Sequence, residues 1–526
     1  MARRSLLAAL ALVAALAVAT PADAGWASEA RALSKGLARA VERGKLTRAE
    51  AAAYRLQIRR TRVALRRFSW IAATNLGAVL RDAAAQARKL NRPRALVLFG
   101  ELRLTRRWLR EHGPPPSGTD VLAPDGVLHR SFPGLGLRFH PLGNFGLLKG
   151  LLARGRVGEA RRLADALAAR GVRTGPGRTV WEYTFPYGGG RAPWTSGMAQ
   201  AVAAQSLAWA ADAHGEPAFA ALAGRAFRAV PGRLTMRLGA GPWVRLYSFS
   251  GLVVLNAQLQ TALSIAGYAR RTGDAGAERF AARLRASSAR LLPSFDTGYW
   301  SLYSPGNESP LSYHRYVVDL LGELWRRTGK AIWRVTAATF DQYTREPPII
   351  RGRPKRRLLY PSPAEGFRDQ TTISFWLSKK STVTVRLPGL SRTMHLGMGR
   401  YRVTWRPRGV APGTYRPRIK AFDLAGNKTA VKLAPITVAV DREPPVVAAR
   451  LRGRRLSWHA VDRATPWVKL AVRLARPGRQ VWIRLGVRPH EGTVRLERRR
   501  SRWEATLFAS DSSGNRTRVR LGAFGG

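Results

Sequence analysis

Four glycines recur at nearly even spacing in the first part of the chain, and they constrain the fold more than any other feature. They follow one another at intervals of 60, 58 and 56 residues, and each ends one apolar run before another begins. The four are Gly155, Gly215, Gly273 and Gly329. Between residue 26 and about residue 343, Ala, Leu and Arg form amphipathic runs of helical period. This spacing predicts an internal repeat of helical hairpins.

A turn at residues 91–93, about one period earlier, extends the series to five hairpins. Five hairpins are too many for a simple bundle and suit a solenoid or a closed α/α toroid. In a toroid the loops that join the hairpins meet at one rim. Three of these loops, residues 181–194, 239–251 and 296–316, are rich in aromatic residues and glycine. We therefore expect any functional site of this region at that rim.

After residue 343 the pattern changes to short alternating strands, such as residues 382–387 and 481–485, between Pro and Gly turns. Two copies are visible. The tetrapeptide Arg-Glu-Pro-Pro at 345–348 recurs at 442–445, and Asp-x-x-Gly-Asn at 423–427 recurs at 511–515. Domains of about 90 residues with this pattern are typical of immunoglobulin-like sandwiches.

The first 24 residues have the pattern of a secretory signal peptide, with two arginines, an apolar run and a small-residue cleavage site before residue 25. The apolar run is short for a membrane span, although an uncleaved anchor stays an alternative. The prediction is thus a signal peptide at 1–24, a toroid-like all-α domain at 25–345, and two all-β sandwiches at 346–441 and 442–526. We expect a secreted or cell-surface protein without a span in the mature chain, and association with the cell envelope stays open.

Composition excludes some chemistry. The chain has no cysteine, which removes thiolate nucleophiles, disulfides and cysteine-ligated metal sites. Ninety Lys and Arg residues against 32 Asp and Glu give a net charge of +58. Two explanations stay open for this charge: a general compositional bias, or a polyanionic partner. Export makes nucleic acid a poor partner and favours an acidic polysaccharide.

The helical region lacks a nucleotide-binding loop, a Gly-x-Ser-x-Gly elbow and a His-Glu-x-x-His motif. Instead it carries residues 292–298, 301–303 and 313–314, which resemble the catalytic domain of the D-glucuronyl C5-epimerase family. Residues 194–200 are similar to the Trp-x-Ser-x-Met-Ala-Gln element of that family. Residues 243–247 and 254–256 resemble its Trp-x-x-Glu-Tyr-Pro and Val-Leu-Asn elements. The resemblance covers roughly residues 130–345.

This resemblance implies an α/α-toroid isomerase that inverts C5 of glucuronate in a heparan-type polysaccharide. The sequence shows no metal-ligand spacing, and we expect neither a cofactor nor a metal. C5 is α to a carboxylate, so the site needs a base, an acid and groups that stabilise an enolate-like intermediate. We expect Tyr313, Tyr303 and Tyr247 to be catalytic, with the tyrosine pKa lowered by adjacent cations. The substrate-binding residues expected from the resemblance and from side-chain chemistry are Arg245, Arg191, Trp194, Gln200, Asn256, His314 and Tyr183.

One departure from the family is serious. The family has a catalytic Glu where this chain has Leu246, and an aliphatic side chain cannot accept a proton. Glu182 or Glu308 can take its place, a tyrosine can act alone, or epimerisation has been lost. Two alternatives therefore stand beside the epimerase: a lyase acting on the same polymers, and a non-catalytic protein that binds acidic glycans. A calcium site built by carboxylates that folding brings together is not excluded.

Overall fold

The structure is a computed structural model, and it describes residues 23–525. The chain divides into two compact units, residues 1–343 and 344–526. Residues 1–22 of the expected signal peptide lie outside the described residues. Within residues 23–525, no helix combines the length and the apolar character needed to cross a membrane.

The first unit is built from paired helices, as the glycine spacing predicts. The helices are α1 (Asp23–Glu42), α2 (Arg48–Arg67), α3 (Trp70–Ala85), α4 (Arg92–His112), α5 (Pro141–Ala153), α6 (Val157–Ala168), α7 (Gly197–His214), α8 (Pro217–Phe227), α9 (Leu255–Thr272), α10 (Ala275–Leu291), α11 (Leu311–Thr328) and α12 (Ala331–Tyr343), with short 3₁₀ turns at Ala87–Lys89 and Leu292–Phe295. The described residues therefore hold six helix pairs, one more than predicted, because α1 and α2 form a pair ahead of the repeat.

The repeated glycines end the first helix of each later pair. Gly215, Gly273 and Gly329 cap α7, α9 and α11 with φ of 57°, 68° and 66°, a left-handed conformation in which glycine carries no Cβ penalty. Gly155 has φ of 68° in the turn between α5 and α6. Asn91, from the predicted earlier turn, accepts a hydrogen bond from Arg94 N as the N-cap of α4. The regular spacing of these glycines in the sequence therefore marks the turn between the two helices of each pair.

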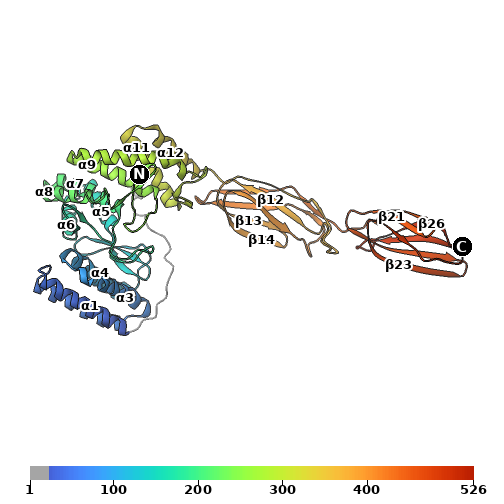
Figure 1. Cartoon of the computed structure of the whole chain (residues 1–526), viewed down its shortest axis with the longest axis horizontal. Coiled ribbons are helices and arrows are strands. Elements are labelled where there is room, and N and C mark those ends of the chain that lie inside the picture. The colour runs from blue at the N-terminus through green and yellow to red at the C-terminus, as the bar shows by residue number, and fades with distance from the viewer. Residues whose placement is uncertain (1–22, 526) are drawn as a thin grey trace. The chain divides into compact units, whose positions relative to one another are not determined.

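The first helices of successive pairs pack side by side. Helix α7 contacts α5 and α9, α9 contacts α11, and each is covered by the second helix of its own pair. A large apolar core lies between α5 and α10. In Figure 1 the pairs follow one another as an arc from α1 to α12. The arrangement in helix pairs is confirmed, whereas closure into a toroid stays a prediction.

A small antiparallel sheet interrupts the helices and was not predicted. It consists of β1 (Asp120–Leu122), β2 (Leu128–Phe132) and β3 (Gly136–Phe139), and β3 contacts α3 and α4. All four residues of β3 and four of the five in β2 are buried. Strands covered on both faces lose the polar alternation by which a strand is recognised, so the sequence shows no signal for this sheet. Three two-stranded ribbons also lie in the loops: β4 (Val172–Arg173) with β5 (Thr179–Val180), β6 (Thr235–Leu238) with β7 (Gly241–Val244), and β8 (Leu302–Ser304) with β9 (Asn307–Glu308).

The second unit is all-β and mostly antiparallel, as the alternation predicts. Its first copy comprises β10 (Ile350–Pro354), β11 (Leu358–Leu359), β12 (Thr371–Leu377), β13 (Ser381–Leu387), β14 (Leu390–Leu396), β15 (Gly399–Trp405), β16 (Gly413–Tyr415), β17 (Arg418–Asp423), β18 (Lys428–Lys432) and β19 (Ile436–Val438). Its second copy comprises β20 (Val446–Arg452), β21 (Arg455–Val461), β22 (Trp467–Arg476), β23 (Arg479–Pro489), β24 (Glu491–Arg495), β25 (Trp503–Ser510) and β26 (Arg516–Phe524).

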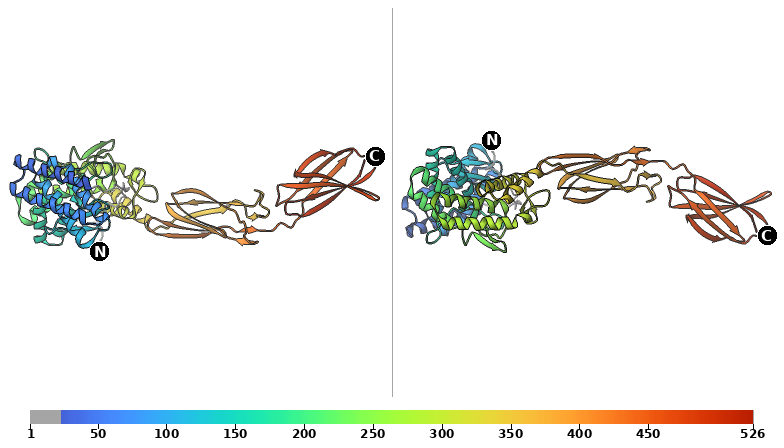
Figure 2. Two further views of the ribbon diagram at one scale, coloured as in Figure 1. Left: turned by 90° about the horizontal axis from the view of Figure 1, so that it is seen from below. Right: turned by 90° about the horizontal axis from the view of Figure 1, so that it is seen from above.

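Each copy has its own apolar core between sheets of corresponding order. In the first copy the sheets are β10-β12-β15 and β14-β13-β17-β18, with a small third sheet β11-β19-β16. In the second copy they are β20-β21-β24 and β23-β22-β25-β26. Figure 2 shows the strands of each copy in facing layers. The all-β region is confirmed, and its immunoglobulin-like assignment stays a prediction.

The two repeated sequence elements meet in each copy. In the first, Asn427 Nδ2 donates to Thr344 O and Asp423 Oδ2, both at 2.9 Å, and reaches Glu346 O at 3.4 Å. In the second copy Asn515 bonds Asp441 O and Glu443 O, both at 3.3 Å. The Asp-x-x-Gly-Asn turn therefore anchors the backbone that leads into the Pro-Pro pair.

The two copies differ in the charged residues beside the Asp-x-x-Gly-Asn turn. In the first copy Lys379 Nζ bonds Asp423 Oδ2 at 3.2 Å and Glu346 O at 2.6 Å. In the second copy Asp462 follows the corresponding strand, and it lies with Asp441 and Asp511 so that one carboxylate oxygen from each is within 4.8 Å of the others. Burial and these two neighbours raise the pKa of Asp511.

Candidate functional site

The three aromatic loops of the first unit meet in one place. Apolar side chains from all three loops belong to a single cluster that also includes the start of α9 and residues of the β2–β3 hairpin. The loop residues are Tyr183, Phe185, Tyr187, Trp194, Val244, Leu246, Tyr247 and Tyr303. Each loop precedes the first helix of the next pair, and these helices pack side by side, so the loops are carried to the same end of the layer. Sequence reasoning expected this meeting of the loops.

Stacked rings hold the first of these loops. The Tyr183 and Trp194 rings lie 4.0 Å apart at 4°, and their backbones exchange two hydrogen bonds. Trp194 Nε1 donates to Phe185 O at 2.8 Å. A Cβ on Gly190 would lie 2.3 Å from the Phe249 ring, so only glycine lets the loop approach the next one this closely. Tyr183 and Trp194 are buried by this packing and support the loop from within.

Four tyrosines lie together against this support, and we call Tyr187, Tyr247, Tyr303 and Tyr313 the tyrosine cluster. Hydrogen bonds link the Tyr247 hydroxyl to those of Tyr187 and Tyr303. The Tyr187 and Tyr247 rings are 5.3 Å apart, and those of Tyr303 and Tyr313 are 5.2 Å apart. Tyr303 lies on β8, Tyr313 lies in the first turn of α11, and Tyr247 follows β7. Tyr187 and Tyr303 are partly exposed, so the cluster reaches the surface.

The electrostatics of the cluster differ from the expectation. Burial raises the pKa of Tyr303 to about 12, although the hydrogen bond with Tyr247 opposes this shift. Burial also raises the pKa of Tyr247, and the neighbouring tyrosines add to the effect. The prediction that adjacent cations lower the pKa of these tyrosines is therefore wrong for these two. Both hydroxyls are protonated at neutral pH and act as proton or hydrogen-bond donors.

Three other expected substrate-binding residues are buried beneath the surface. His314 is 0% exposed, stacks on Trp300, and places its ring nitrogens at 2.8 Å from Ser301 Oγ and 2.7 Å from Phe340 O. We therefore correct its role to fixing the start of α11. Gln200 donates to Trp181 O, and Asn256 lies in the first turn of α9. The amide oxygens of both accept no hydrogen bond from the described residues, which distinguishes them from ordinary buried amides.

The remaining expected residues lie at the edges of the site. Arg191 is exposed, and half-buried Arg245 donates to Ser250 O at 3.1 Å. Leu246, in the place of the family's Glu, is buried in the same apolar cluster as Tyr247. Glu182 forms a two-pronged pair with Arg94, with both distances 2.8 Å. Glu308 accepts a hydrogen bond from Tyr299, which lies outside the tyrosine cluster.

Sequence reasoning missed Tyr187, although it singled out the loop in which this residue lies. The signal was a tyrosine followed by three glycines, which makes a tight turn beside an aromatic ring. It also missed a buried ion network. Arg138 pairs with Asp82 at 2.5 Å and Glu101 at 3.3 Å, and Glu101 accepts hydrogen bonds from Phe139 N and Thr184 Oγ1. This network ties the sheet to the loop that carries Tyr183 and Tyr187, but its members lie far apart in sequence.

Comparison with known proteins bears on this unit. Residues 176–342 match the family described as D-glucuronyl C5-epimerase C-terminus. No curated protein matches the chain. Among solved structures, an endoglucanase from Komagataeibacter sucrofermentans is similar at 13% identity over 36% of this chain and 68% of that one, with a TM-score of 0.28. A D-mannose isomerase is similar at 12% identity over 53% and 76% of the two chains, with a TM-score of 0.33.

The fibronectin(III)-like modules of Clostridium thermocellum CbhA are similar at 15% identity over 34% of this chain and 93% of that one, with a TM-score of 0.16. These structural likenesses are too slight to carry an argument. The family match includes all four tyrosines of the tyrosine cluster. The tyrosine cluster of this chain therefore lies within a segment that matches the D-glucuronyl C5-epimerase C-terminal family.

Proposed function

We propose that the first unit binds a uronate-containing polysaccharide at the tyrosine cluster and exchanges the C5 proton of its glucuronyl residues, which inverts that carbon. One observation carries the proposal: three tyrosines at the family's positions, from three separate segments, lie in one group of interacting side chains that reaches the surface. The family match of residues 176–342 supports the same chemistry.

Removal of the C5 proton places negative charge on the neighbouring carboxylate. Protonated hydroxyls close to that carboxylate stabilise the charge, and one of them returns a proton to the opposite face of C5. Tyr303, with its raised pKa, suits the donor role. We assign the acceptor role to Tyr313, because the N-terminus of α11 favours negative charge on its first turn.

The raised pKa of Tyr303 limits the role that this residue can take in catalysis. A phenolate on a group with a pKa of about 12 costs about 6 kcal/mol at pH 7.5. Tyr303 therefore does not serve as the base unless bound substrate supplies most of this energy. This cost is the reason for separating the donor, Tyr303, from the acceptor, Tyr313.

Exchange is tested with the purified mature chain and heparosan, an unsulfated glucuronate polymer, in D₂O. Deuterium at C5 with new iduronate signals in the NMR spectrum supports the proposal, whereas ultraviolet absorbance from unsaturated ends identifies a lyase. Tyr303→Phe and Tyr313→Phe should abolish exchange. Tyr299→Phe is the matched control, because Tyr299 lies in the same loop but bonds Glu308. Loss of exchange in all three variants would contradict the assigned roles.

A second candidate function is binding of acidic glycans without turnover, and Leu246 favours it because the family's carboxylate is absent from the cluster. Leu246→Glu restores that carboxylate, and Leu246→Gln matches its size without a titrating group. If the natural chain exchanges no deuterium but binds heparosan, and only Leu246→Glu gains exchange, the chain is a binding protein derived from an epimerase fold.

We also propose that the protein works outside the cytoplasm. The pattern of residues 1–24 supports this placement. Amino-terminal sequencing of the protein recovered from the culture medium or cell envelope tests it. A first residue at or near Gly25 is expected, and retention of Met1 in a cytoplasmic protein would contradict the proposal.

A further inference from the structure

The outer face of the β10-β12-β15 sheet in the second unit carries an ordered set of side chains. Strand alternation points Ile373 and Phe375 into the core, and their neighbours point outward. The strand pairing aligns the outward residues in three rows across the sheet. The rows are Arg351–Trp376–Arg400, Arg353–Ser374–Arg402 and Lys355–Thr372–Thr404.

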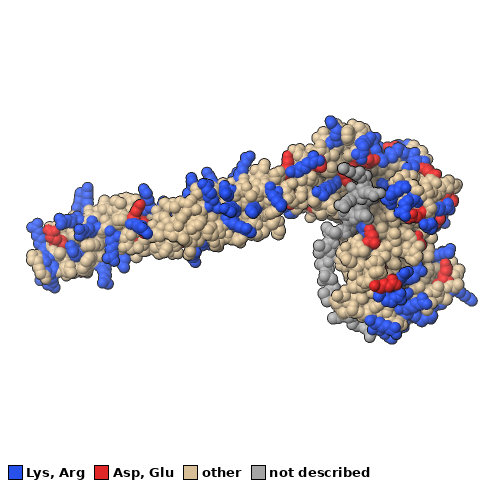
Figure 3. Space-filling model, turned by 180° about the vertical axis from the view of Figure 1, so that it is seen from behind, with Lys and Arg blue, Asp and Glu red and all other residues tan. Residues whose placement is uncertain are grey.

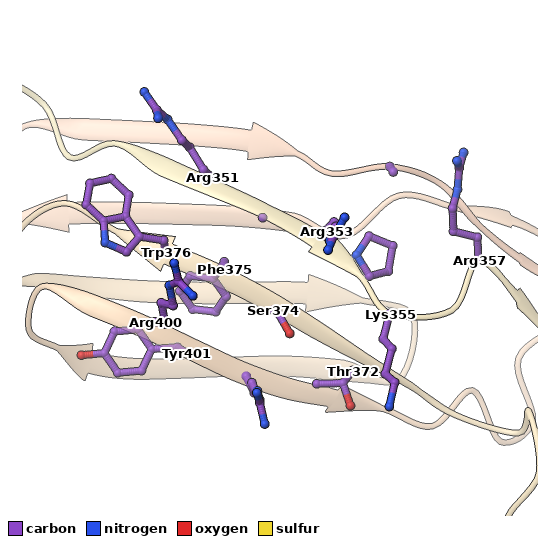
Figure 4. Close-up of a pocket in the computed structure, with 14 residues that line it drawn as sticks. Arg351, Arg353, Lys355, Arg357, Thr372, Ser374, Phe375, Trp376, Arg400 and Tyr401 are labelled. Carbon is purple, nitrogen blue, oxygen red and sulfur yellow. The ribbon is translucent and has the colours of Figure 1, made fainter.

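These rows form a groove along the central strand. Ser374 and Thr372 are short, whereas the flanking strands carry long basic side chains, so the middle of the face is lower than its sides. The result is an open groove of about 1580 Å³. Figure 4 shows the half-buried Trp376 with Arg351 and Arg400 at one end of the groove, and Thr372 with Lys355 at the other. Three rows at alternate strand positions span roughly 14 Å.

The groove is basic and has free charge. Six cations line it, and its lining includes no Asp or Glu. The six are Arg351, Arg353, Lys355, Arg357, Arg400 and Arg402. None of them has an ion pair with the residues that the structure describes. On the face drawn in Figure 3, basic side chains lie on both units of the described chain, so charge alone does not single out the groove. The ordered rows of basic side chains beside the Trp376 indole ring distinguish this face.

The second copy provides an internal comparison. On the corresponding β20-β21-β24 face, the row that matches Ser374 and its neighbours is Arg450–Ser457–Thr493, and the next row is Ala448–His459–Glu491. His459 and Glu491 lie 3.6 Å apart. This face has no outward Trp, Tyr or Phe ring, and it carries the Glu491 carboxylate. The groove is therefore a property of the first copy alone and not of the repeat.

We propose that this groove binds a strand of the acidic polysaccharide. Arginine matches carboxylates in two-pronged geometry, and the Trp376 ring offers a flat apolar surface for a sugar ring. Charge complementarity selects a polyanion, and the family of the first unit selects a uronate polymer over a nucleic acid. The inference rests on the proposed function for the identity of the polymer, and it adds a second binding site outside the tyrosine cluster.

Binding is measured directly, so the test does not depend on catalysis. The full mature chain is titrated into fluorescently labelled heparosan at 150 mM salt, where the Debye length of about 8 Å suppresses long-range attraction. The groove variant is the triple substitution Arg351→Gln, Arg353→Gln and Arg400→Gln. The matched control is Arg450→Gln, Arg452→Gln and Arg495→Gln, which removes the same charge from exposed positions of the second copy.

The groove variant should raise the Kd for heparosan about tenfold, the effect expected for three exposed ion pairs of middle-range strength, and the control less than twofold. Trp376→Ser should weaken binding without any change of charge, and unchanged thermal midpoints verify the fold. Equal weakening by both triple variants would overturn the proposal, because the polymer would then respond to net charge only. Tighter binding of a single-stranded oligonucleotide of matched charge would overturn it too.

Failure of the proposed function has a different signature. If Tyr313→Phe abolishes C5 exchange but leaves the Kd unchanged, while the groove variant raises the Kd and leaves exchange on short oligosaccharides unchanged, both proposals hold. If the natural chain exchanges no deuterium but the groove variant still raises the Kd, only the catalytic proposal is contradicted. If the groove variant leaves the Kd unchanged, only the proposed polysaccharide binding in the groove is contradicted.

Discussion

Replacement of Arg138 by Met should destabilise the first unit strongly and in a way that depends on pH. The Arg138 side chain is 0% exposed, and its guanidinium bonds Asp82, Glu101 and Leu135 O. Met keeps most of the apolar stem but removes the charge. Asp82 and Glu101 are then left as buried carboxyls without their cation.

The magnitude follows from these contacts. Removing one partner of a buried ion pair costs about 3–5 kcal/mol, and the lost hydrogen bond to Leu135 O adds about 1 kcal/mol. The total of about 4–6 kcal/mol is comparable to the stability of a whole domain. For a unit of this size it corresponds to a fall in Tm of roughly 6–9 °C.

The pH dependence has a defined sign. Burial already raises the pKa of Glu101 and Asp82, and Arg138 opposes this shift in both. Without Arg138 the pKa of each carboxyl in the folded state rises further above its unfolded value. The stability that protonation provides is therefore present at low pH and is lost as pH rises through the folded-state pKa. The deficit of Arg138→Met should shrink as pH falls toward about 5.

The assay is urea unfolding of the full chain followed by tryptophan fluorescence at several pH values. Arg103→Met, on the exposed side of α4, is the control and should cost less than about 0.5 kcal/mol. Glu101→Gln added to Arg138→Met should recover part of the loss, because the amide still accepts from Phe139 N. A deficit below about 2 kcal/mol, or one that is independent of pH, would refute the reasoning.

Three further predictions concern single groups. The tyrosinate absorbance that Tyr303→Phe removes should titrate above pH 11, and a midpoint near the ordinary value of 10 would contradict burial as the cause. Asn427→Ala should lower the stability of the second unit by about 1–3 kcal/mol in thermal denaturation, and more than Asn515→Ala, whose bonds to the leading strand are longer. Asp462→Asn should raise stability slightly at pH 7, by at most about 0.5 kcal/mol, because it relieves repulsion that raises the pKa of Asp511. That gain should vanish near pH 3, and a gain that persists there would exclude repulsion.

The helix pairs and the all-β region could be predicted from the sequence because both depend on local pattern. A glycine that ends a helix in the left-handed conformation marks its own turn, as Gly215 and Gly273 do. Alternation in residues 382–387 reports one buried face of one strand. The β2 and β3 strands escaped prediction because burial on both faces removes that alternation.

The candidate site divides in the same way. Sequence order and motif spacing were sufficient to name Tyr247, Tyr303 and Tyr313, and the structure places them together. His314 adjoins Tyr313 in sequence, yet packing directs it into the core, where both ring nitrogens find partners. Adjacency along a helix does not determine which side chain reaches the surface, and only the packed structure does.

The amino-acid sequence by itself determined the helical period, the strand repeat, the excess of positive charge and the family match of residues 176–342. Tertiary structure alone decided the ionisation of the tyrosines and the place of the basic groove. A pKa depends on how much water surrounds a group, and a groove depends on which strands pair. Both properties arise from residues far apart in the chain, so folding must bring those residues together before either property exists.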